Sequence, residues 1–271
     1  MNIVSAFIVP GSPLPELCPD VAAWQEFKTA MQRAGEELRA AKPDVVLMYS
    51  TQWYAVLDEL WLTRPRSQDI HVDANWHELG EIPYDLRADV DLATACVQAC
   101  RDQGIQAKGV DYDKFPIDTG TIVAASALGI GDESLPLVLV ANNLYDDAAA
   151  TEKLGSIATT CAKLQGKKVA LVAVGSLSSS VFTTPIDYET DHIVKSEEDE
   201  WNRRFLALLE EGNKEAIDEI MPSYTNEARV DMGFKHFNWI MGALGGCFSS
   251  AEVYHYGALY GSGAAVIKLQ P

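Results

Sequence analysis

The chain has 271 residues, 48% of them hydrophobic, and a formal net charge of −18. A chain of this length and composition can bury a large core within one domain of the α/β class. Its acidic charge would repel a polyanion such as DNA or an anionic membrane, so we expect neither as a partner. No apolar run approaches the ~20 residues that cross a bilayer, and we expect a cytoplasmic protein.

Short apolar runs alternate along the chain with longer amphipathic segments. The short runs lack the polar alternation of a half-buried strand, so they predict strands buried on both faces, at 3–9, 45–49, 137–140, 169–174 and 264–267. Helix-period apolar positions predict helices at 24–38, 86–100, 150–164, 201–208 and 234–248. This alternation predicts a single α/β domain over 1–271, with a largely parallel central sheet and amphipathic helices on both faces.

Ligands of parallel sheets bind beyond the carboxyl ends of the strands. The segments to inspect are therefore those that follow the predicted strands, at 10–15, 50–53, 142–145 and 175–180. The last is rich in serine but lacks the lysine and the glycine spacing of a phosphate-binding loop, so we interpret it as a turn. Residues of about 60–83 show no element, and we expect a long irregular loop that binds something or packs over a partner.

Several short motifs occur in an order that resembles one enzyme family. They are a Pro-x-x-Pro turn at 10–13, Ser-x-x-Trp at 50–53, Asp-Thr-Gly at 118–120, Gly-Ser-Leu-Ser at 175–178 and Gly-Phe-Lys at 233–235. Over nearly the whole chain this order resembles the class III extradiol ring-cleavage dioxygenases of the protocatechuate 4,5-dioxygenase type. Members hold Fe(II) with two histidines and one carboxylate, which leaves a face of the metal open to a catechol or aminophenol and to O2.

The resemblance places poor iron donors at the positions of the family's metal ligands. Gly11 stands where the first histidine follows the proline, and Gln52 stands where the second precedes the tryptophan. Ser179 takes the place of the acid/base histidine, and Thr119 that of a histidine or tyrosine of active members. The carboxylate falls on Asp231. Imidazoles supply most of the donor strength, so the resemblance implies no catalytic residue, metal or cofactor on this chain.

A family fold without its ligands resembles the non-catalytic alpha subunits of heteromeric members, whose companion beta subunit carries the Fe(II). The resemblance implies a larger catalytic beta subunit as partner, an α2β2 heterotetramer and a supporting role in opening the ring of an aminophenol. Aromatic residues are enriched at the centres of interfaces, so Trp53, Trp61 and Trp76 are candidate interface residues. Core packing beneath an irregular lid would explain these tryptophans equally well.

Two other functions remain open. One is an enzyme with an unorthodox site, built from His71, Asp73 and His77 around a metal, or from Ser179 and His192 without one. The six-residue separation of the two loop histidines matches no known metal signature. The other is a small-molecule binding or regulatory module, which would use the crevice lined by Gln52, Asp118, Ser179 and Asp231.

Overall fold

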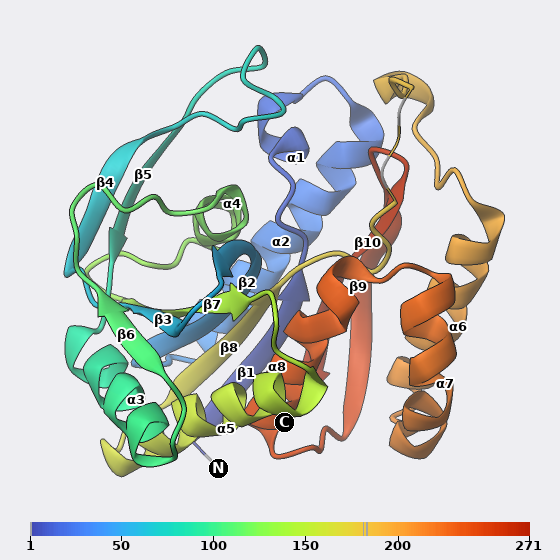
Figure 1. The fold of residues 1–271 in the computed structure, drawn as a ribbon. Helices are drawn as coiled ribbons and strands as arrows, with labels where there is room; N and C mark the ends of the chain where they lie inside the picture. Colours follow the sequence, from blue (N-terminus) through green and yellow to red (C-terminus); the bar gives the residue numbers. More distant parts are fainter. Residues whose placement is uncertain (1, 181, 183) are drawn as a thin grey trace.

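The computed structural model describes residues 2–180, 182 and 184–271 (Figure 1). Its strands are β1 (Ile3–Val9), β2 (Val45–Ala55), β3 (Glu59–Leu62), β4 (Arg66–His71), β5 (Ile82–Arg87), β6 (Ala107–Val110), β7 (Leu137–Asn143), β8 (Val169–Val174), β9 (Ser250–Leu259) and β10 (Ser262–Gln270). Its helices are α1 (Leu14–Leu17), α2 (Ala22–Ala40), α3 (Val90–Asp102), α4 (Thr119–Leu128), α5 (Ala148–Leu164), α6 (Ser196–Glu210), α7 (Lys214–Glu227) and α8 (Lys235–Leu244). All five apolar runs that predicted strands form strands.

Eight strands form one sheet in the order β6-β3-β7-β2-β8-β1-β10-β9. The central strands β7, β2, β8 and β1 pair in parallel, and their residues are almost all buried. Continuous Val and Leu runs suit this position because both faces of the strands are covered. At one edge the hairpin β9–β10 is antiparallel and pairs with β1 through β10. The predicted α/β class with a largely parallel sheet is confirmed.

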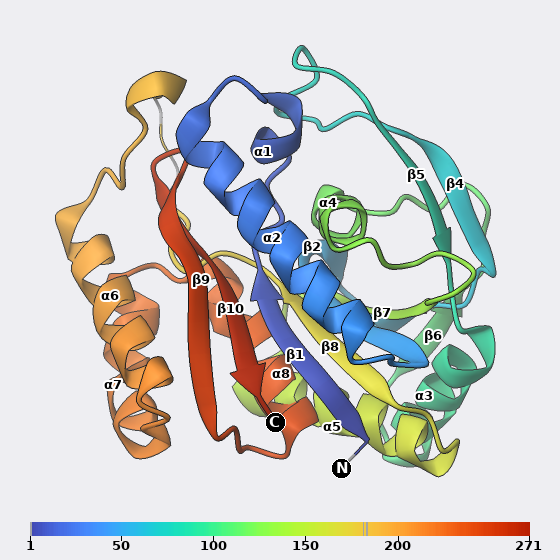
Figure 2. The ribbon, with the colours of Figure 1, turned by 180° about the vertical axis from the view of Figure 1, so that it is seen from behind.

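Helices cover both faces of the sheet. On the face toward the viewer in Figure 1, α3, α5 and α8 cross the strands. Seen from behind in Figure 2, α2 runs across the opposite face, with α1 and α4 beside it. The apolar stripe of α2, which includes Trp24, Phe27 and Leu38, is buried there with Phe7 and Val172 of the sheet. Two separate apolar cores result, one on each face of the sheet.

Two glycines bring α5 and α8 into backbone contact. A Cβ at Gly155 would lie 2.1 Å from the carbonyl oxygen of Trp239, and one at Gly242 would lie 1.9 Å from that of Glu152. Only glycine permits so close an approach. The contact fixes α8 against α5, and with it the short 3₁₀ turn Asp231–Phe234 that precedes α8.

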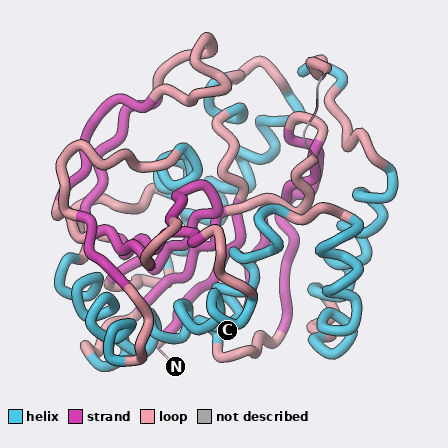
Figure 3. The backbone as a smooth tube through the Cα atoms, in the orientation of Figure 1, coloured by secondary structure: helices cyan, strands magenta, loops and turns pink. Residues whose placement is uncertain are grey.

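The segment 60–83 is not the irregular loop that the sequence led us to expect. β3 and β4 lie within or overlap its first half, and β4 pairs with β5 in a separate two-stranded sheet at one side of the molecule (Figure 3). Within it, only 63–65 and 72–81 lie outside the strands. The expectation failed because β4 is largely exposed and polar, so it shows no apolar pattern, and because β3 has only four residues.

Within the described part of the chain, no helix combines the length and the apolar character that crossing a membrane requires.

Candidate functional site

A cleft of about 780 Å³ opens at the carboxyl ends of the parallel strands. Three of the four segments singled out in the sequence meet in it, because it is lined by residues after β1, within the end of β2 and after β8. The fourth segment, 142–145, lies outside the cleft. The wall includes six aromatic side chains, Trp53, Tyr54, Trp76, Phe115, Phe182 and Tyr260. Among the described lining residues there are three carboxylates and no lysine or arginine.

An irregularity in β2 turns polar residues toward the cleft. Tyr49 pairs with Val140 of β7, and the next pair joins Tyr54 to Asn142, so four residues of β2, 50–53, lie opposite one residue of β7. These residues leave the ladder with β7 as a bulge does, although Ser50 still pairs with Val174 of β8. Bulges re-aim side chains next to functional sites. The polar groups of Ser50, Thr51 and Gln52 thereby become available to the residues around the cleft.

The side chain of Gln52 closes the floor of the cleft. Its amide nitrogen donates to the carbonyl oxygen of Gly11 at 3.2 Å, and its amide oxygen accepts from the backbone N–H of Gly120 at 2.9 Å. A primary amide can make both bonds because it carries a donor and an acceptor. Gln52 therefore ties the turn after β1 to the first turn of α4.

No side chain fits at Gly11. A Cβ there would lie 2.8 Å from the Cα of Gly120 and 2.9 Å from both the amide nitrogen of Gln52 and a methyl group of Val174. Real Cβ atoms do not approach other heavy atoms so closely, so the glycine is required by the packing around it. Gly11 and Gln52 therefore form one closely packed unit with no space for a further side chain, and we call it the sealed floor of the cleft.

Two partly buried carboxylates flank this unit. Asp118 caps the N-terminus of α4, where it accepts from the backbone N–H and the hydroxyl of Thr121 and from the hydroxyl of Ser50. Asp231 accepts from the hydroxyl of Thr51 at 2.8 Å and from the backbone N–H of Ser176 at 3.1 Å. Burial raises the pKa of both carboxyl groups, against these hydrogen bonds, which lower it.

The backbone next to Asp231 is strained. Met232, Gly233 and Phe234 follow it with φ values of 47°, 65° and 64°. Left-handed conformations cost about 1–2 kcal/mol for each residue other than glycine, and such strain is found where a site requires a particular side-chain direction. The turn holds Asp231 at the cleft.

A chain of hydrogen bonds joins the irregular segment 72–81 to α4. Nε2 of His71 lies 2.7 Å from the hydroxyl oxygen of Thr119, and that hydroxyl donates to the carboxylate of Asp73 at 2.6 Å. The hydroxyl therefore accepts from His71, whose Nε2 carries the proton. Asp73 also accepts from the backbone N–H groups of Asn75 and Trp76. These contacts hold one wall of the cleft in place.

Comparison with known proteins gives the family. Residues 17–267 match the model described as the catalytic LigB subunit of aromatic ring-opening dioxygenase. The chain belongs to the LigB family. It is 62% identical over 268 residues, 99% of each chain, to the 2-aminophenol 1,6-dioxygenase alpha subunit of a Pseudomonas species. This membership confirms the resemblance to the class III extradiol dioxygenases that the order of the motifs indicated.

Two more distant relatives match almost the whole chain. The 2-aminophenol 1,6-dioxygenase beta subunit of a Pseudomonas species is 28% identical over 286 residues, 98% of this chain and 93% of that one. The crystal structure of an uncharacterized protein of Escherichia coli K12 superposes with a TM-score of 0.69 at 14% identity, covering 98% of this chain and 99% of that one. The second match shows a shared fold.

The residues that the motif resemblance places at the family's ligand positions do not form a donor set for iron. Gly11 has no side chain, and both polar atoms of the Gln52 amide are already bonded to backbone. Asp231 remains as one carboxylate, and one carboxylate with a neutral amide is a poor Fe(II) site. Among the residues that the structure describes, no three His, Cys, Asp or Glu side chains gather as a metal would require.

The residues of the two alternative sites are not brought together. His77 is exposed beside Glu78, away from the chain of bonds that joins His71 to Asp73, so the loop residues form no three-ligand cluster. Ser179 lies in the cleft wall, but its hydroxyl donates to the carbonyl oxygen of Arg229. His192 is exposed and bonded to the carbonyl oxygen of Thr190, outside the cleft. Neither proposed arrangement exists in this fold.

Two of the three candidate interface tryptophans belong to the core. Trp53 is 3% exposed and donates to the carbonyl oxygen of Pro116, and Trp61 is fully buried in β3. A side chain that is buried in the lone chain has no surface left for a partner, so the interface role is wrong for both. Trp76 is partly exposed and packs edge-on against Tyr260, with ring centroids 4.6 Å apart.

Sequence reasoning missed the groups that hold the acids of the cleft. Ser50 and Thr51 support Asp118 and Asp231 across 68 and 180 residues of sequence. Their position at the end of an apolar strand was a signal, because hydroxyls directly after a buried strand need partners. The identity of those partners is set by the bulge in β2, which leaves no mark in the hydrophobic pattern.

Proposed function

We propose that this chain is the non-catalytic alpha subunit of a 2-aminophenol 1,6-dioxygenase, whose Fe(II) is bound by a homologous beta subunit. The observation that carries the proposal is the 62% identity to such an alpha subunit over 99% of both chains. The beta subunit matches at 28%, so the two kinds of subunit share an ancestor. In this role the chain itself opens no ring.

The sealed floor of the cleft supports this role. At the Gly11 and Gln52 positions the chain offers a glycine with no room for a side chain and an amide with both polar atoms engaged. These groups stabilise the chain and offer no open coordination position. We infer an α2β2 heterotetramer in which each alpha chain supports a beta chain.

The proposal also places the protein in the cytoplasm. All five cysteines, Cys18, Cys96, Cys100, Cys161 and Cys247, are free thiols. Free thiols suit a reducing compartment, in which disulfides are rare.

The test compares two preparations from iron-replete cells. One is the chain purified alone, and the other is the chain purified after co-expression with a 2-aminophenol 1,6-dioxygenase beta subunit. We expect near-zero iron and no turnover of 2-aminophenol for the lone chain. The co-expressed pair is expected to sediment as α2β2, to hold iron in proportion to beta and to cleave 2-aminophenol. One iron per lone alpha chain together with ring cleavage, or no association with beta, would contradict the proposal.

A second function is favoured by the open part of the cleft. Above the Gln52 floor the cleft keeps aromatic walls, Asp73, Asp118 and Asp231, and no described lysine or arginine, a combination that suits a small aromatic ligand with hydrogen-bond donors. The test is to titrate the lone chain with 2-aminophenol under anaerobic conditions and to follow tryptophan fluorescence. Saturable quenching that Asp231→Asn weakens would support a binding site. Quenching that is linear and unaffected by Asp231→Asn would exclude one.

A further inference from the structure

Half of the exposed large apolar side chains lie at one place. Ten such side chains are exposed in the described part of the chain, and five of them are Tyr54, Val56, Leu57, Leu144 and Tyr145. We call these five the β2–β7 patch. Leu57 and Tyr145 are 80% and 82% exposed. Single exposed apolar residues are normal on a protein surface, but a cluster of them marks an interaction site.

The two segments of the patch are held together by backbone hydrogen bonds. Tyr54 and Ala55 pair with Asn142 and Asn143, and the N–H of Leu144 donates to the carbonyl oxygen of Ala55 at 3.0 Å. In Figure 1 the ends of β2 and β7 lie side by side near the centre of the view. The backbone pairing therefore brings the two segments that carry the patch next to each other on a rigid support.

Acidic groups surround the patch. Asp58, Asp146 and Asp147 lie in the same two segments, and Glu59 is buried beneath them with one carboxylate oxygen that has no partner. Two lysines are near: Lys108 pairs with Asp58 at 2.8 Å, and the ammonium group of Lys235 donates to the carbonyl oxygen of Asn143 at 2.6 Å. The acids outnumber the bases, so a partner needs basic groups at its edge.

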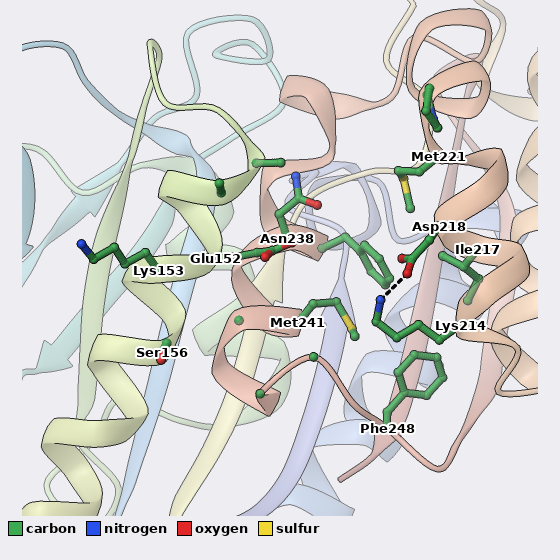
Figure 4. A pocket seen from close by; sticks show the side chains of 17 residues that line it. Glu152, Lys153, Ser156, Lys214, Ile217, Asp218, Met221, Asn238, Met241 and Phe248 are labelled. Atoms are coloured by element: carbon green, nitrogen blue, oxygen red, sulfur yellow. Dashed lines mark hydrogen bonds and ion pairs between the residues drawn. The ribbon is translucent and has the colours of Figure 1, made fainter.

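A groove lined by both apolar and polar side chains begins where the patch ends. Ala148 and Ala149, three and four positions after Tyr145, form the start of its wall, and its volume is about 640 Å³. It lies between α5, α7 and α8, and Figure 4 shows Ile217, Met221, Met241 and Phe248 along it, with the ion pair of Lys214 and Asp218 at the rim. Methionine side chains adapt readily to an inserted group.

We propose that the β2–β7 patch and the adjoining groove form the docking surface for the beta subunit, which meets them with an apolar centre and a lysine- or arginine-rich edge. This inference rests on the proposed function, which supplies the partner. A second copy of this chain fits poorly, because a two-fold contact through the patch would set the acidic rims of both copies against each other. The beta subunit inserts apolar side chains into the groove.

Matched surface variants test the location of the interface. Leu57→Asp lies in the patch, and Leu164→Asp, at a residue that is 83% exposed at the end of α5, is its control. Tyr145→Ala also lies in the patch. Its control is Tyr112→Ala, at a residue that is 70% exposed. Each is co-expressed with the beta subunit, and the dissociation constant is measured by sedimentation. We expect at least ~30-fold weaker association for the patch variants, the loss typical of a central interface residue, and less than ~3-fold for the controls.

The outcomes separate the two proposals. If the wild-type chain does not bind the beta subunit, the proposed function fails. If wild type binds and the patch variants bind as tightly as their controls, the docking surface lies elsewhere and this inference fails. The melting temperature of each lone variant is recorded as well, since all four positions are exposed and should leave it unchanged. A patch variant that melts with wild type and does not bind supports the inference.

Salt dependence tests the charge of the partner. Association with a basic edge should weaken as salt is raised from 50 to 500 mM, because screening removes the attraction to Asp58, Asp146 and Asp147. Asp147→Asn, which can still cap α5, should reduce this dependence. Association that strengthens with salt would show an acidic edge on the partner and overturn this part of the inference.

Discussion

The carboxyl end of β2 separates two regions of opposite character. Toward β8 and β1, the Gln52 amide satisfies backbone groups and fills the floor of the cleft. Toward β7, Leu57 and Tyr145 are left exposed. On the side toward β8 and β1, the polar groups form hydrogen bonds within the chain. On the side toward β7, apolar side chains are exposed to solvent. For the proposed supporting role, we expect ordered packing at the floor of the cleft and exposed apolar area at the proposed docking surface.

The largest loss of stability should come from placing a side chain at Gly11, in the closely packed floor of the cleft. Gly11→His must push apart Gly120, Gln52 and Val174, each within 2.9 Å of a new Cβ, and we expect a loss of about 3 kcal/mol or more in unfolding free energy. Urea denaturation measures it. Adding Gln52→His leaves the clash with Gly120 and Val174, so the double variant should bind iron weakly and show no turnover. Ser12→His, at a partly exposed neighbour, is the control and should cost far less.

The next largest loss of stability should come from removing the two hydrogen bonds of the Gln52 amide without adding volume. Gln52→Leu deprives the N–H of Gly120 and the carbonyl oxygen of Gly11 of their partners, which should cost about 2 kcal/mol. Gln98→Leu, on the exposed face of α3, is the matched change and should stay within about 0.5 kcal/mol. Equal effects of the two substitutions would mean that the sealed floor of the cleft is no more ordered than the surface.

The carboxyl group of Glu59, which lies beneath the β2–β7 patch, should make the free energy of unfolding depend on pH. Burial, and then the charge of Asp146, raise the pKa of Glu59 from 4.5 to about 7. The folded state therefore holds a proton that the unfolded state releases, and the stabilisation that is complete below pH 4.5 is lost as pH rises through 7. Between pH 5 and pH 8 the wild type should lose about 1–3 kcal/mol more than Glu59→Gln.

Thermal or urea unfolding at both pH values measures this difference. Glu81→Gln, at an exposed position, should behave as wild type. A Glu59→Gln variant with the same pH dependence as wild type would show that Glu59 is ionised throughout and that its surroundings are already neutralised.

The smallest effect is expected in the cleft wall. Thr119→Val removes the hydroxyl between His71 and Asp73 at nearly constant volume, and we expect a loss of about 1 kcal/mol. Amide hydrogen exchange should also speed up at Asn75 and Trp76, which Asp73 orders. Thr29→Val, on the exposed face of α2, should change neither. Unchanged exchange in Thr119→Val would mean that the wall is held by other contacts.

Hydrophobic pattern was a sufficient guide to the central strands, but it did not predict α4, which is also extensively buried. The runs that became β1, β2, β7 and β8 are apolar along their length because they are covered on both faces. The pattern failed for β4, which is paired only with β5 and is largely exposed. It also failed for Trp53 and Trp61, because a sequence without a correct strand assignment does not tell a core aromatic from a surface one.

By itself, the sequence determined the α/β class, the strand ends at which the cleft forms and the family to which the chain belongs. These follow from local composition and the order of motifs along the chain. Only the tertiary structure decided that Gln52 bonds to Gly11 and Gly120, that Asp231 and Thr51 meet, and where apolar surface stays exposed. Each of these depends on contacts between segments far apart in the chain, which are fixed by the bulge in β2 and the packing of α4 and α8 against the sheet.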